Sequence, residues 1–495
     1  MWFKQLSEQY GPIFSVWKGT NLQIVLNTPT LIKELLDKRG VKYSSRPPMW
    51  VMHNYIFEGI SIVSTAYGDV WRKQRKVFNS LVGPATVHRF LPYQDFESKQ
   101  YVVDMLDSPE KFFFHAERFG ASILTSTTYG VRIHSLEHES AQPLVYMGNW
   151  LESRLTPAQF ADDRWPILQW LPRPLAPWRA AYDQDRVTLK AIAKAWWNPV
   201  KRSVETATDS PCFASRFYKS YQEDGWTEEQ AALVALGLLL AGSGTTASIQ
   251  NFLVLGCVTN PEAVKKAHEE LDRVVGDSRL PTLEDETSLP YIRAMIKETM
   301  RWRPFSNQGS FYHATSKDDW YGQYFIPTGT TIIANAFSVH HDEAKYPDPD
   351  RFHPDRYINY PLSAQEYVKI PNAEDRDHFA YGAGRRICVG MPLAEASLFL
   401  LTSRLLWGFN IEPAKNASGE DVCPDTLGYA PGIFAKPNPF PAKVSPRSEK
   451  RSELMRAEFA KTPKLAQSLS EKFDAGAMRE LERVSANLRD SLSRR

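Results

Sequence analysis

Residues 379–390 read F-A-Y-G-A-G-R-R-I-C-V-G, and the rest of the chain is organised around this stretch. A glycine-rich bend with Gly382 and Gly384 precedes two arginines and one cysteine, Cys388. The apolar run that follows, 391–409, is predicted to be a helix. Backbone N–H groups at a helix start and nearby cations favour a thiolate and lower the pKa of its thiol. The stretch therefore predicts an ionised, accessible sulfur.

The sulfur of Cys388 is suited to act as a single ligand of a metal ion, at one coordination position. No cysteine or histidine stands close enough in the sequence to complete a zinc set, so one axial bond to a metal cofactor fits better, and haem iron is the obvious candidate. A dinucleotide-binding loop would need a third glycine, but Ile387 follows Gly382-x-Gly384-x-x. A structural cysteine would not need the glycine and arginine framing.

The spacing Y-x-x-G-x-R-x-C-x-G, from Tyr381 to Gly390, resembles the cysteine-ligand loop of the cytochrome P450 family. Tyrosine stands where the family usually has phenylalanine. The resemblance covers about residues 5 to 445 and implies a mainly α fold with a smaller β-rich subdomain. It also implies a bound haem b whose iron takes Cys388 as its axial ligand, with Arg386 among the haem-binding residues.

Further haem contacts are implied by the same resemblance. Trp71 and Arg75 stand four residues apart on one face of a predicted helix, where the family binds a haem propionate. A guanidinium is well shaped to hold a carboxylate. His313 occupies the position of a second propionate contact, and His340 is a third candidate. For both histidines, an ordinary hydrogen-bonded histidine with no ligand is an equally good interpretation.

A long apolar helix is predicted from Thr227 to Cys257, with Thr227 and Gln230 forming a capping box. Its middle reads L-L-L-A-G-S-G-T-T, and each of its two glycines costs about 1 kcal/mol relative to alanine. A poor helical turn in such a place usually has a reason. In the family the reason is a groove over the haem where oxygen binds.

The resemblance assigns the catalytic hydroxyls of this groove to Thr245, as the proton relay, and to Thr246 beside it. The chain departs from the family motif at Gly244, where the family has an acid. Proton delivery without that carboxylate must use water, Ser243 or the substrate itself.

A structural motif of the family is also present. Glu298 and Arg301 lie three residues apart on a predicted helix. In the family this pair joins an arginine from a later loop in a buried charge network, and the segment P-D-R-F predicts Arg351 as the third member. Buried charges of this kind require mutual pairing.

The composition is that of an ordinary globular protein. The 495 residues carry a net charge of +2, with 43% hydrophobic and 23% charged residues, so no charge bias indicates nucleic acid as a partner. Four widely spaced cysteines do not form a disulfide framework, which fits a reduced, cytosol-facing compartment.

The domain organisation follows from these patterns and from the resemblance. We expect a catalytic domain over 1–445, with its β-rich part at about 11–65 and 311–337, and a charged, helical extension over 446–495. The extension has apolar residues at roughly helical spacing between positions 465 and 492.

Membrane association is expected by resemblance. No hydrophobic anchor opens the chain, and its longest apolar run, 231–242, is shorter than the ~20 residues that a bilayer requires. The family nevertheless predicts the cytosolic face of the endoplasmic reticulum membrane. The proline-rich segment 165–178 carries tryptophans suited to a lipid interface, although inward packing of the same tryptophans explains it nearly as well.

The implied reaction is C–H hydroxylation of a small hydrophobic organic substrate, with one oxygen atom taken from O2. No flavin, nicotinamide or iron–sulfur motif is present, so electrons are expected from NADPH through NADPH–cytochrome P450 reductase. The segment A-G-S-G-T-T-A-S resembles that of family members from filamentous fungi that act in secondary metabolism, and this resemblance suggests a phenolic or polyketide substrate. Two alternatives stay open: a haem-thiolate isomerase or peroxide-driven enzyme, and a non-catalytic haem-binding module.

Overall fold

A computed structural model describes most of the chain, namely residues 2–138, 141, 144–145, 147–150, 160–209, 212–242, 244–305, 311–430, 435–462, 479, 483 and 486. Two compact units divide it. Unit 1 comprises 1–47, 82–116 and 245–462, and unit 2 comprises 48–81, 117–244 and 463–495. Ser243, most of the predicted tail helix and parts of two stretches that would face the substrate by the family resemblance (305–309 and 428–434) lie outside the described residues.

Unit 1 contains the strands and many of the helices. Its helices are α1 (Trp2–Tyr10), α2 (Pro29–Ile32), α3 (Gly40–Tyr43), α5 (Leu91–Asp107), α12 (Thr245–Thr259), α13 (Pro261–Val274), α14 (Pro290–Trp302), α15 (Ala336–His340), α16 (Ala364–Lys369), α17 (Met391–Gly408) and α18 (Glu449–Ala460). Its strands are β1 (Ile13–Lys18), β2 (Asn21–Leu26), β3 (His313–Ala314), β4 (Asp319–Tyr321), β5 (Tyr324–Ile326), β6 (Thr331–Ala334), β7 (Phe409–Pro413) and β8 (Ala442–Pro446). The prediction of a mainly helical protein with a smaller β-rich part is confirmed.

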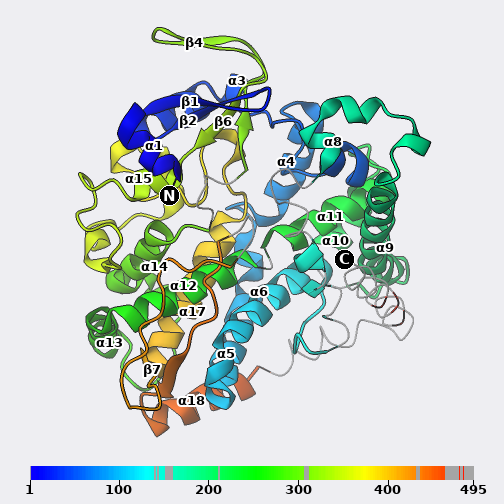
Figure 1. Ribbon diagram of the computed structural model, residues 1–495. Coiled ribbons are helices and arrows are strands. Elements are labelled where there is room, and N and C mark those ends of the chain that lie inside the picture. The colour runs from blue at the N-terminus through cyan, green and yellow to red at the C-terminus, as the bar shows by residue number, and fades with distance from the viewer. Residues whose placement is uncertain are drawn as a thin grey trace. The chain divides into compact units, whose positions relative to one another are not determined.

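The largest sheet has the strand order β1-β2-β6-β3. Strands β1 and β2 form a hairpin within the predicted β-rich part, and β2 pairs in parallel with β6. Strands β4 and β5 form a separate hairpin that projects beyond this sheet (Figure 1). Apolar side chains of β2 and β6 are buried together, so the two sequence regions that alternate in polarity share one sheet.

The core beneath this sheet reaches the cysteine loop. Helix α2 starts after the cap residue Thr28, where Leu31 N donates to Thr28 Oγ1 over 3.3 Å, and the chain continues as a π-helix over Lys33–Lys38. Leu35 and Leu36 from this π-helix pack in one buried cluster with Phe379 and Ala383 of the loop. The sheet subdomain thus supports the loop that carries Cys388.

Helix α18 packs against the rest of unit 1. Phe459 stacks on Phe96 of α5 with 5.7 Å between ring centroids, and Arg451 donates to Asp272 over 2.6 Å. Met455 is fully buried, and its sulfur would lie 2.8 Å from a Cβ at Gly408, where α17 ends. The first part of the predicted extension is therefore a packed element.

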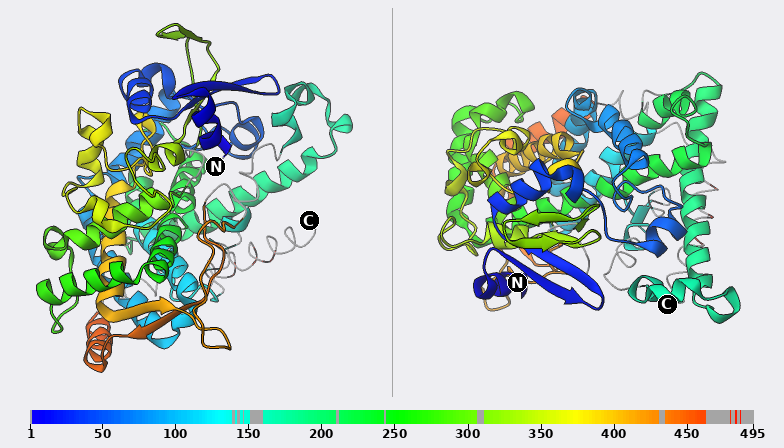
Figure 2. Two further views of the ribbon diagram at one scale, coloured as in Figure 1. Left: turned by 60° about the vertical axis from the view of Figure 1, so that its left-hand side comes forward. Right: turned by 90° about the horizontal axis from the view of Figure 1, so that it is seen from above.

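Unit 2 is helical in its described part. Its elements are α4 (Asp69–Val82), most of α6 (Phe112–Tyr129), α8 (Ala161–Arg164), α9 (Arg179–Glu205), α10 (Phe213–Ser220) and α11 (Glu228–Gly242). Helix α9 is the longest of them and is seen along its length in the right-hand view of Figure 2. Trp196 and Trp197 of α9 are fully buried.

The predicted long helix is described in two parts, one on each side of Ser243. It begins at Glu228 with the predicted capping box, since Gln230 N donates to Thr227 Oγ1 over 3.2 Å. Helix α11 ends at Gly242 and α12 begins at Thr245. By length and composition Glu228–Thr259 could cross a membrane, but 59% of its most apolar window is buried, as in the core helix of a water-soluble protein. Gly242 is the last described residue of α11, and Gly244, the other glycine that made this turn a poor helix in the sequence, is in a turn.

Candidate active site

The cysteine loop is a bend held open by glycine. Gly384 has φ +66°, and a Cβ at this residue would lie 2.2 Å from the carbonyl oxygen of Leu36. The loop can pass so close to the π-helix only because this residue has no side chain. Two bonds fix the bend, from Gly384 N to Asp37 Oδ1 (2.6 Å) and from Cys388 N to Tyr381 O (2.9 Å).

Cys388 follows this bend and is exposed, whereas Cys257 is buried in α12. Helix α17 begins three residues later at Met391, with Pro392 in its first turn. The N-terminal end of a helix favours a nearby anion. Burial, in contrast, raises the pKa of the Cys257 thiol to about 12. Of these two cysteines, only Cys388 has the surroundings of a reactive thiolate.

Positive charge gathers on the strand side of the loop. His313 on β3 is buried, and burial together with the guanidinium groups of Arg46 and Arg386 lowers its pKa to about 3. Arg386 Nε donates to Ser44 O over 2.7 Å, and Arg46 Nη1 donates to Phe311 O over 2.7 Å. Burial lowers the pKa of Arg46 to about 9. The structure thus brings His313 and Arg386 together and adds Arg46.

Arg46 was not predicted from the sequence as a site residue. The only sequence feature that could have indicated it is the segment S-S-R-P-P at 44–48, just before the aromatic stretch 50–57. Proline after an arginine favours an extended chain, which presents the side chain away from the backbone. In the structure the guanidinium of Arg46 donates to the backbone carbonyl groups of Phe311 and Tyr312. The sequence pattern alone does not predict these bonds.

These residues fit a haem. A porphyrin with a thiolate-bound iron needs an accessible sulfur and positive side chains for its propionates, and unit 1 offers Cys388 for the first and Arg46 and Arg386, beside the neutral ring of His313, for the second. Burial and nearby positive charge make the charge of a guanidinium costly, so a bound carboxylate would stabilise it.

Thr245 and Thr246 open helix α12 and are half-buried, whereas the residues from Ala247 to Val258 are buried. Ile249 lies one turn beyond Thr245, on the same face. It packs in one cluster with Tyr381 of the cysteine loop and Met391 of α17. The face of α12 that carries Thr245 therefore turns toward the cysteine loop within unit 1.

The two glycines before Thr245 differ in their surroundings. A Cβ at Gly242 would lie 2.6 Å from Leu124 Cδ1 on α6, so this glycine permits the close packing of two helices in unit 2. A Cβ at Gly244 would meet no atom within 4 Å. The space at Gly244 would admit the side chain that the family motif has there, so crowding does not explain the missing acid.

Trp71 and Arg75 lie on α4 in unit 2, whereas Cys388 and His313 belong to unit 1. Trp71 is buried, and its ring lies 5.3 Å from the ring of Tyr67. Helix α4 is fixed by Lys73, whose Nζ donates to Gly225 O over 2.8 Å and lies over the ring of Trp226.

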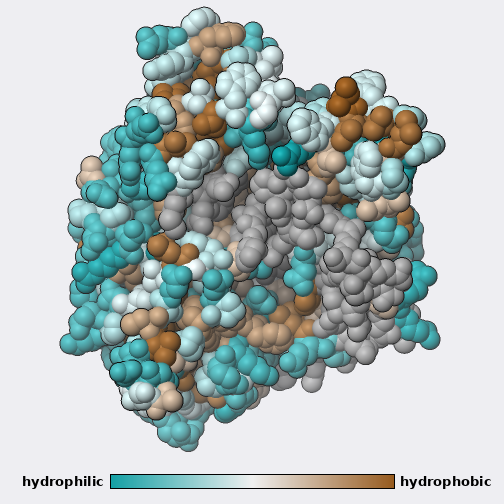
Figure 3. Space-filling model, in the orientation of Figure 1, coloured by the Kyte–Doolittle hydropathy of each residue, from teal (hydrophilic) through white to brown (hydrophobic). Residues whose placement is uncertain are grey.

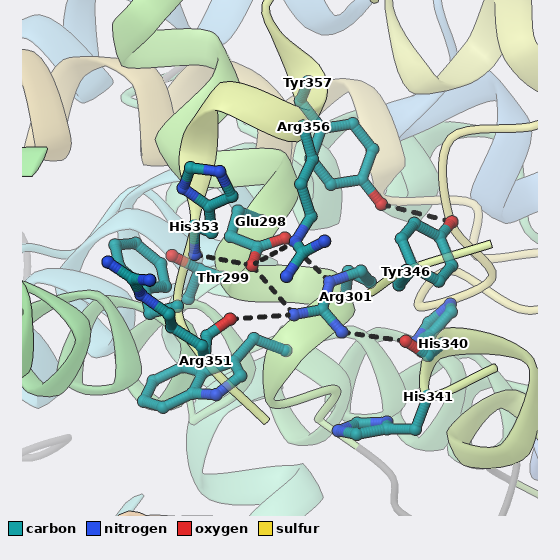
Figure 4. Close-up of polar contacts among 12 residues, drawn as sticks. Glu298, Thr299, Arg301, His340, His341, Tyr346, Arg351, His353, Arg356 and Tyr357 are labelled. Atoms are coloured by element: carbon teal, nitrogen blue, oxygen red, sulfur yellow. Dashed lines mark hydrogen bonds and ion pairs between the residues drawn. The ribbon is translucent and has the colours of Figure 1, made fainter. Parts of the chain in front are cut away.

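The predicted charge network exists, but its third arginine is not Arg351. Arg301 donates to both carboxylate oxygens of Glu298, over 2.7 and 2.8 Å, and both side chains are fully buried. The second guanidinium at Glu298 belongs to Arg356, with 3.6 Å between Nε and Oε1 (Figure 4). Arg351 is exposed and contributes only its backbone carbonyl. The prediction of Arg351 was wrong because the turn between Asp348 and His353 directs its side chain outward.

His340 contacts the same network from α15. Its backbone carbonyl accepts a hydrogen bond from Arg301 Nη1 over 2.8 Å, and its ring is fully buried. His340 was predicted as a candidate propionate contact, and its ring instead accepts from the backbone N–H of Phe379, over 2.8 Å.

Comparison with known proteins agrees with this arrangement. The family model for cytochrome P450 matches residues 1–440. Among curated proteins, the chain is 36% identical to a cytochrome P450 monooxygenase of Hypocrea virens (virE) over 92% of this chain and 83% of that protein. It is also 36% identical to one of Clonostachys rogersoniana (verL), over 91% of this chain and 84% of that protein.

A solved structure also matches the fold. The zebra fish cytochrome P450 with abiraterone superposes with a TM-score of 0.70 at 22% identity, covering 90% of this chain and 99% of that chain. With the family model, the fungal relatives and the cysteine loop in agreement, the chain belongs to the cytochrome P450 family, as a haem-binding monooxygenase.

Proposed function

We propose that the protein hydroxylates a small hydrophobic organic substrate, in the secondary metabolism of a filamentous fungus, with Cys388 as the axial ligand of haem b. The observation that carries the proposal is the exposed sulfur of Cys388 on a glycine bend at the start of α17. Haem iron with a thiolate ligand supplies the activation of O2 that such a reaction needs.

The side chains have separate roles in this proposal. Arg46, His313 and Arg386 bind the propionates from unit 1, and Trp71 and Arg75 on α4 bind a propionate in the family's manner. The hydroxyl groups of Thr245 and Thr246 hold and pass the protons that the reduction of O2 consumes. With Gly244 in place of an acid, water beside Thr245 or a polar group of the substrate completes the relay.

The electron donor in this proposal is NADPH, through NADPH–cytochrome P450 reductase. The test combines the haem-loaded protein, the reductase, NADPH and a panel of small phenols and polyketides. We expect at least one hydroxylated product whose formation depends on NADPH, O2 and the reductase. Gly244 favours one alternative, a peroxide-driven or isomerising enzyme; product formed with hydrogen peroxide, or with no oxidant, and never with NADPH and reductase would favour it.

Membrane association of the protein, at the cytosolic face of the endoplasmic reticulum, belongs to the same proposal. The segment after α8 exposes Trp165, Ile167, Trp170 and Leu175, and Trp170 is 87% exposed. Figure 3 shows hydrophobic side chains gathered over this segment. Exposed tryptophan and aliphatic side chains together are typical of a membrane interface. Flotation with liposomes tests this, and a Trp165→Ser/Trp170→Ser variant is expected to bind them several-fold more weakly.

A further inference from the structure

Histidine side chains bind the first two backbone amides of the cysteine loop. Phe379 N donates to His340 Nε2 over 2.8 Å, and Ala380 N donates to His378 Nδ1 over 3.3 Å. His340 is the last residue of α15, and both rings are buried. Two histidine side chains thus hold the start of the loop, one from α15 and one from the residue just before the loop.

Both histidines must be neutral to make these bonds. A ring nitrogen that accepts from an N–H carries a lone pair, so the proton of His340 resides on Nδ1. Burial, with the nearby side chains of His378, His341 and Arg301, lowers the pKa of His340 well below its usual value. Burial lowers the pKa of His378 to about 4. Both rings are therefore acceptors at neutral pH.

His340 is also fixed from its other side. Arg301 Nη1 donates to the backbone carbonyl of His340 over 2.8 Å, and Arg301 is paired with Glu298 on α14 (Figure 4). One residue thus connects the buried charge network to the loop. Beyond Phe379 the loop is fixed by its own bonds, from Gly382 N to Phe379 O (2.8 Å) and from Cys388 N to Tyr381 O (2.9 Å), and by a bond to the π-helix, from Gly384 N to Asp37 Oδ1 (2.6 Å).

We propose that His340 is a positioning residue for Cys388: its neutral ring holds the start of the loop and connects the Glu298–Arg301 pair to the sulfur. The inference rests on the proposed role of Cys388 as the haem ligand. Loss of the acceptor leaves the N–H of Phe379 buried without a partner, which frees the loop and loosens the hold on the sulfur.

The test compares four variants of the full chain. His340→Phe keeps a ring but removes the acceptor, and His340→Asn places its oxygen too near the backbone to reach Phe379. His340→Gln sets an amide oxygen near the position of Nε2 and should rescue the bond. His341→Phe is the matched control, since His341 is equally buried and stacks on Phe337, and within the described part of the chain it makes no hydrogen bond to the loop.

The first readout is hydrogen exchange at the amides of Phe379 and Ala380 in the protein without haem. We expect exchange about tenfold faster in His340→Phe and His340→Asn, as the loss of one buried hydrogen bond predicts. Exchange near the wild-type rate is expected in His340→Gln and His341→Phe. If His340→Phe does not fold, the difference between His340→Asn and His340→Gln decides. Equal exchange in those two variants, or in His340→Phe and His341→Phe, would overturn the inference.

The second readout is the fraction of haem-loaded protein that gives the red-shifted Soret band of a thiolate ligand when it is reduced and bound to carbon monoxide. We expect this fraction to fall several-fold in His340→Phe relative to His341→Phe, and to recover in His340→Gln. An unchanged fraction contradicts the positioning role. A wild-type protein without this band contradicts the ligand role of Cys388, and the exchange measurement then still decides whether His340 holds the loop.

Discussion

The guanidinium of Arg356 faces the carboxylate of Glu298, with 3.6 Å between Nε and Oε1. Arg301 occupies the other side of the same carboxylate, and the backbone N–H of His353 donates to it over 2.8 Å. Glu298 is therefore surrounded by donors from α14 and from the loop after Phe352. A fully buried carboxylate needs several such donors, because no water is there to solvate its charge.

Arg356→Leu is expected to lower the free energy of unfolding by about 1–3 kcal/mol, because it removes one partner of a buried carboxylate that keeps another. Arg351→Leu is the control, since its side chain is exposed, and it should change the stability by less than about 0.5 kcal/mol. Urea denaturation of both variants measures this. The reverse order of the two effects would restore Arg351 as the third member of the network.

Gly384→Ala is expected to destabilise the protein more than Gly382→Ala. Both residues have positive φ, which costs alanine about 1–2 kcal/mol. Only at Gly384 does the new Cβ also collide with a backbone carbonyl, that of Leu36, which adds about 1–3 kcal/mol. Thermal unfolding and haem retention compare the two variants, and equal losses would show that the loop does not pass as close to Leu36 as described.

Gly244→Asp is expected to fold with a change in stability within about 1 kcal/mol, because its Cβ meets open space. Gly242→Ala, two residues earlier, is expected to lose about 1–3 kcal/mol through the contact with Leu124. In the proposed relay, the new carboxylate beside Thr245 raises the amount of product formed per NADPH consumed. An unchanged ratio would show that proton delivery at this position does not limit the reaction.

The pH dependence of stability has an identifiable contribution from Glu395 on α17. Burial raises the pKa of its carboxyl group to about 7, although Ala364 N donates to it over 2.8 Å. Between pH 4.5 and about 7 the folded protein binds this proton more tightly than the unfolded chain. The favourable contribution of Glu395 is therefore complete below pH 4.5 and is lost as the pH rises to about 7.

Glu395→Gln should remove this loss, so the stability of the variant relative to wild type should rise by about 3 kcal/mol from pH 4.5 to pH 7.5. Urea denaturation at several pH values measures it. Glu366→Gln is the control. Its carboxyl pKa is lowered by hydrogen bonds from Ser363, so that variant should lose stability relative to wild type as the pH rises. The same trend in both variants would contradict the assignment to Glu395.

Local signals predicted local structure well. The predicted capping box of Thr227 and Gln230 begins α11, and side-chain caps of the same local kind, from Thr28 and Asn260, begin α2 and α13. Such a cap depends on hydrogen bonds within four residues, which the local sequence specifies. The cysteine loop was recognisable for the same reason, since its bend depends on its own glycines.

Contacts between distant segments were the source of the errors and omissions. Whether Arg351 or Arg356 reaches Glu298 depends on how one turn directs two arginines five residues apart, and the segment P-D-R-F does not specify that direction. The role of Gly242 depends on Leu124, which lies more than a hundred residues away in the sequence. The packing of α18 depends on Phe96 and Asp272. Tertiary packing decides all three.

The central claim, that Cys388 is the axial ligand of haem iron, is tested most directly by the absorption spectrum of the reduced protein bound to carbon monoxide. The account predicts a strongly red-shifted Soret band in the wild type and in Cys423→Ala, a control at another exposed cysteine, and its loss in Cys388→Ala. A wild-type band at the position of ordinary histidine-ligated haem, or a red-shifted band that persists in Cys388→Ala, would contradict it.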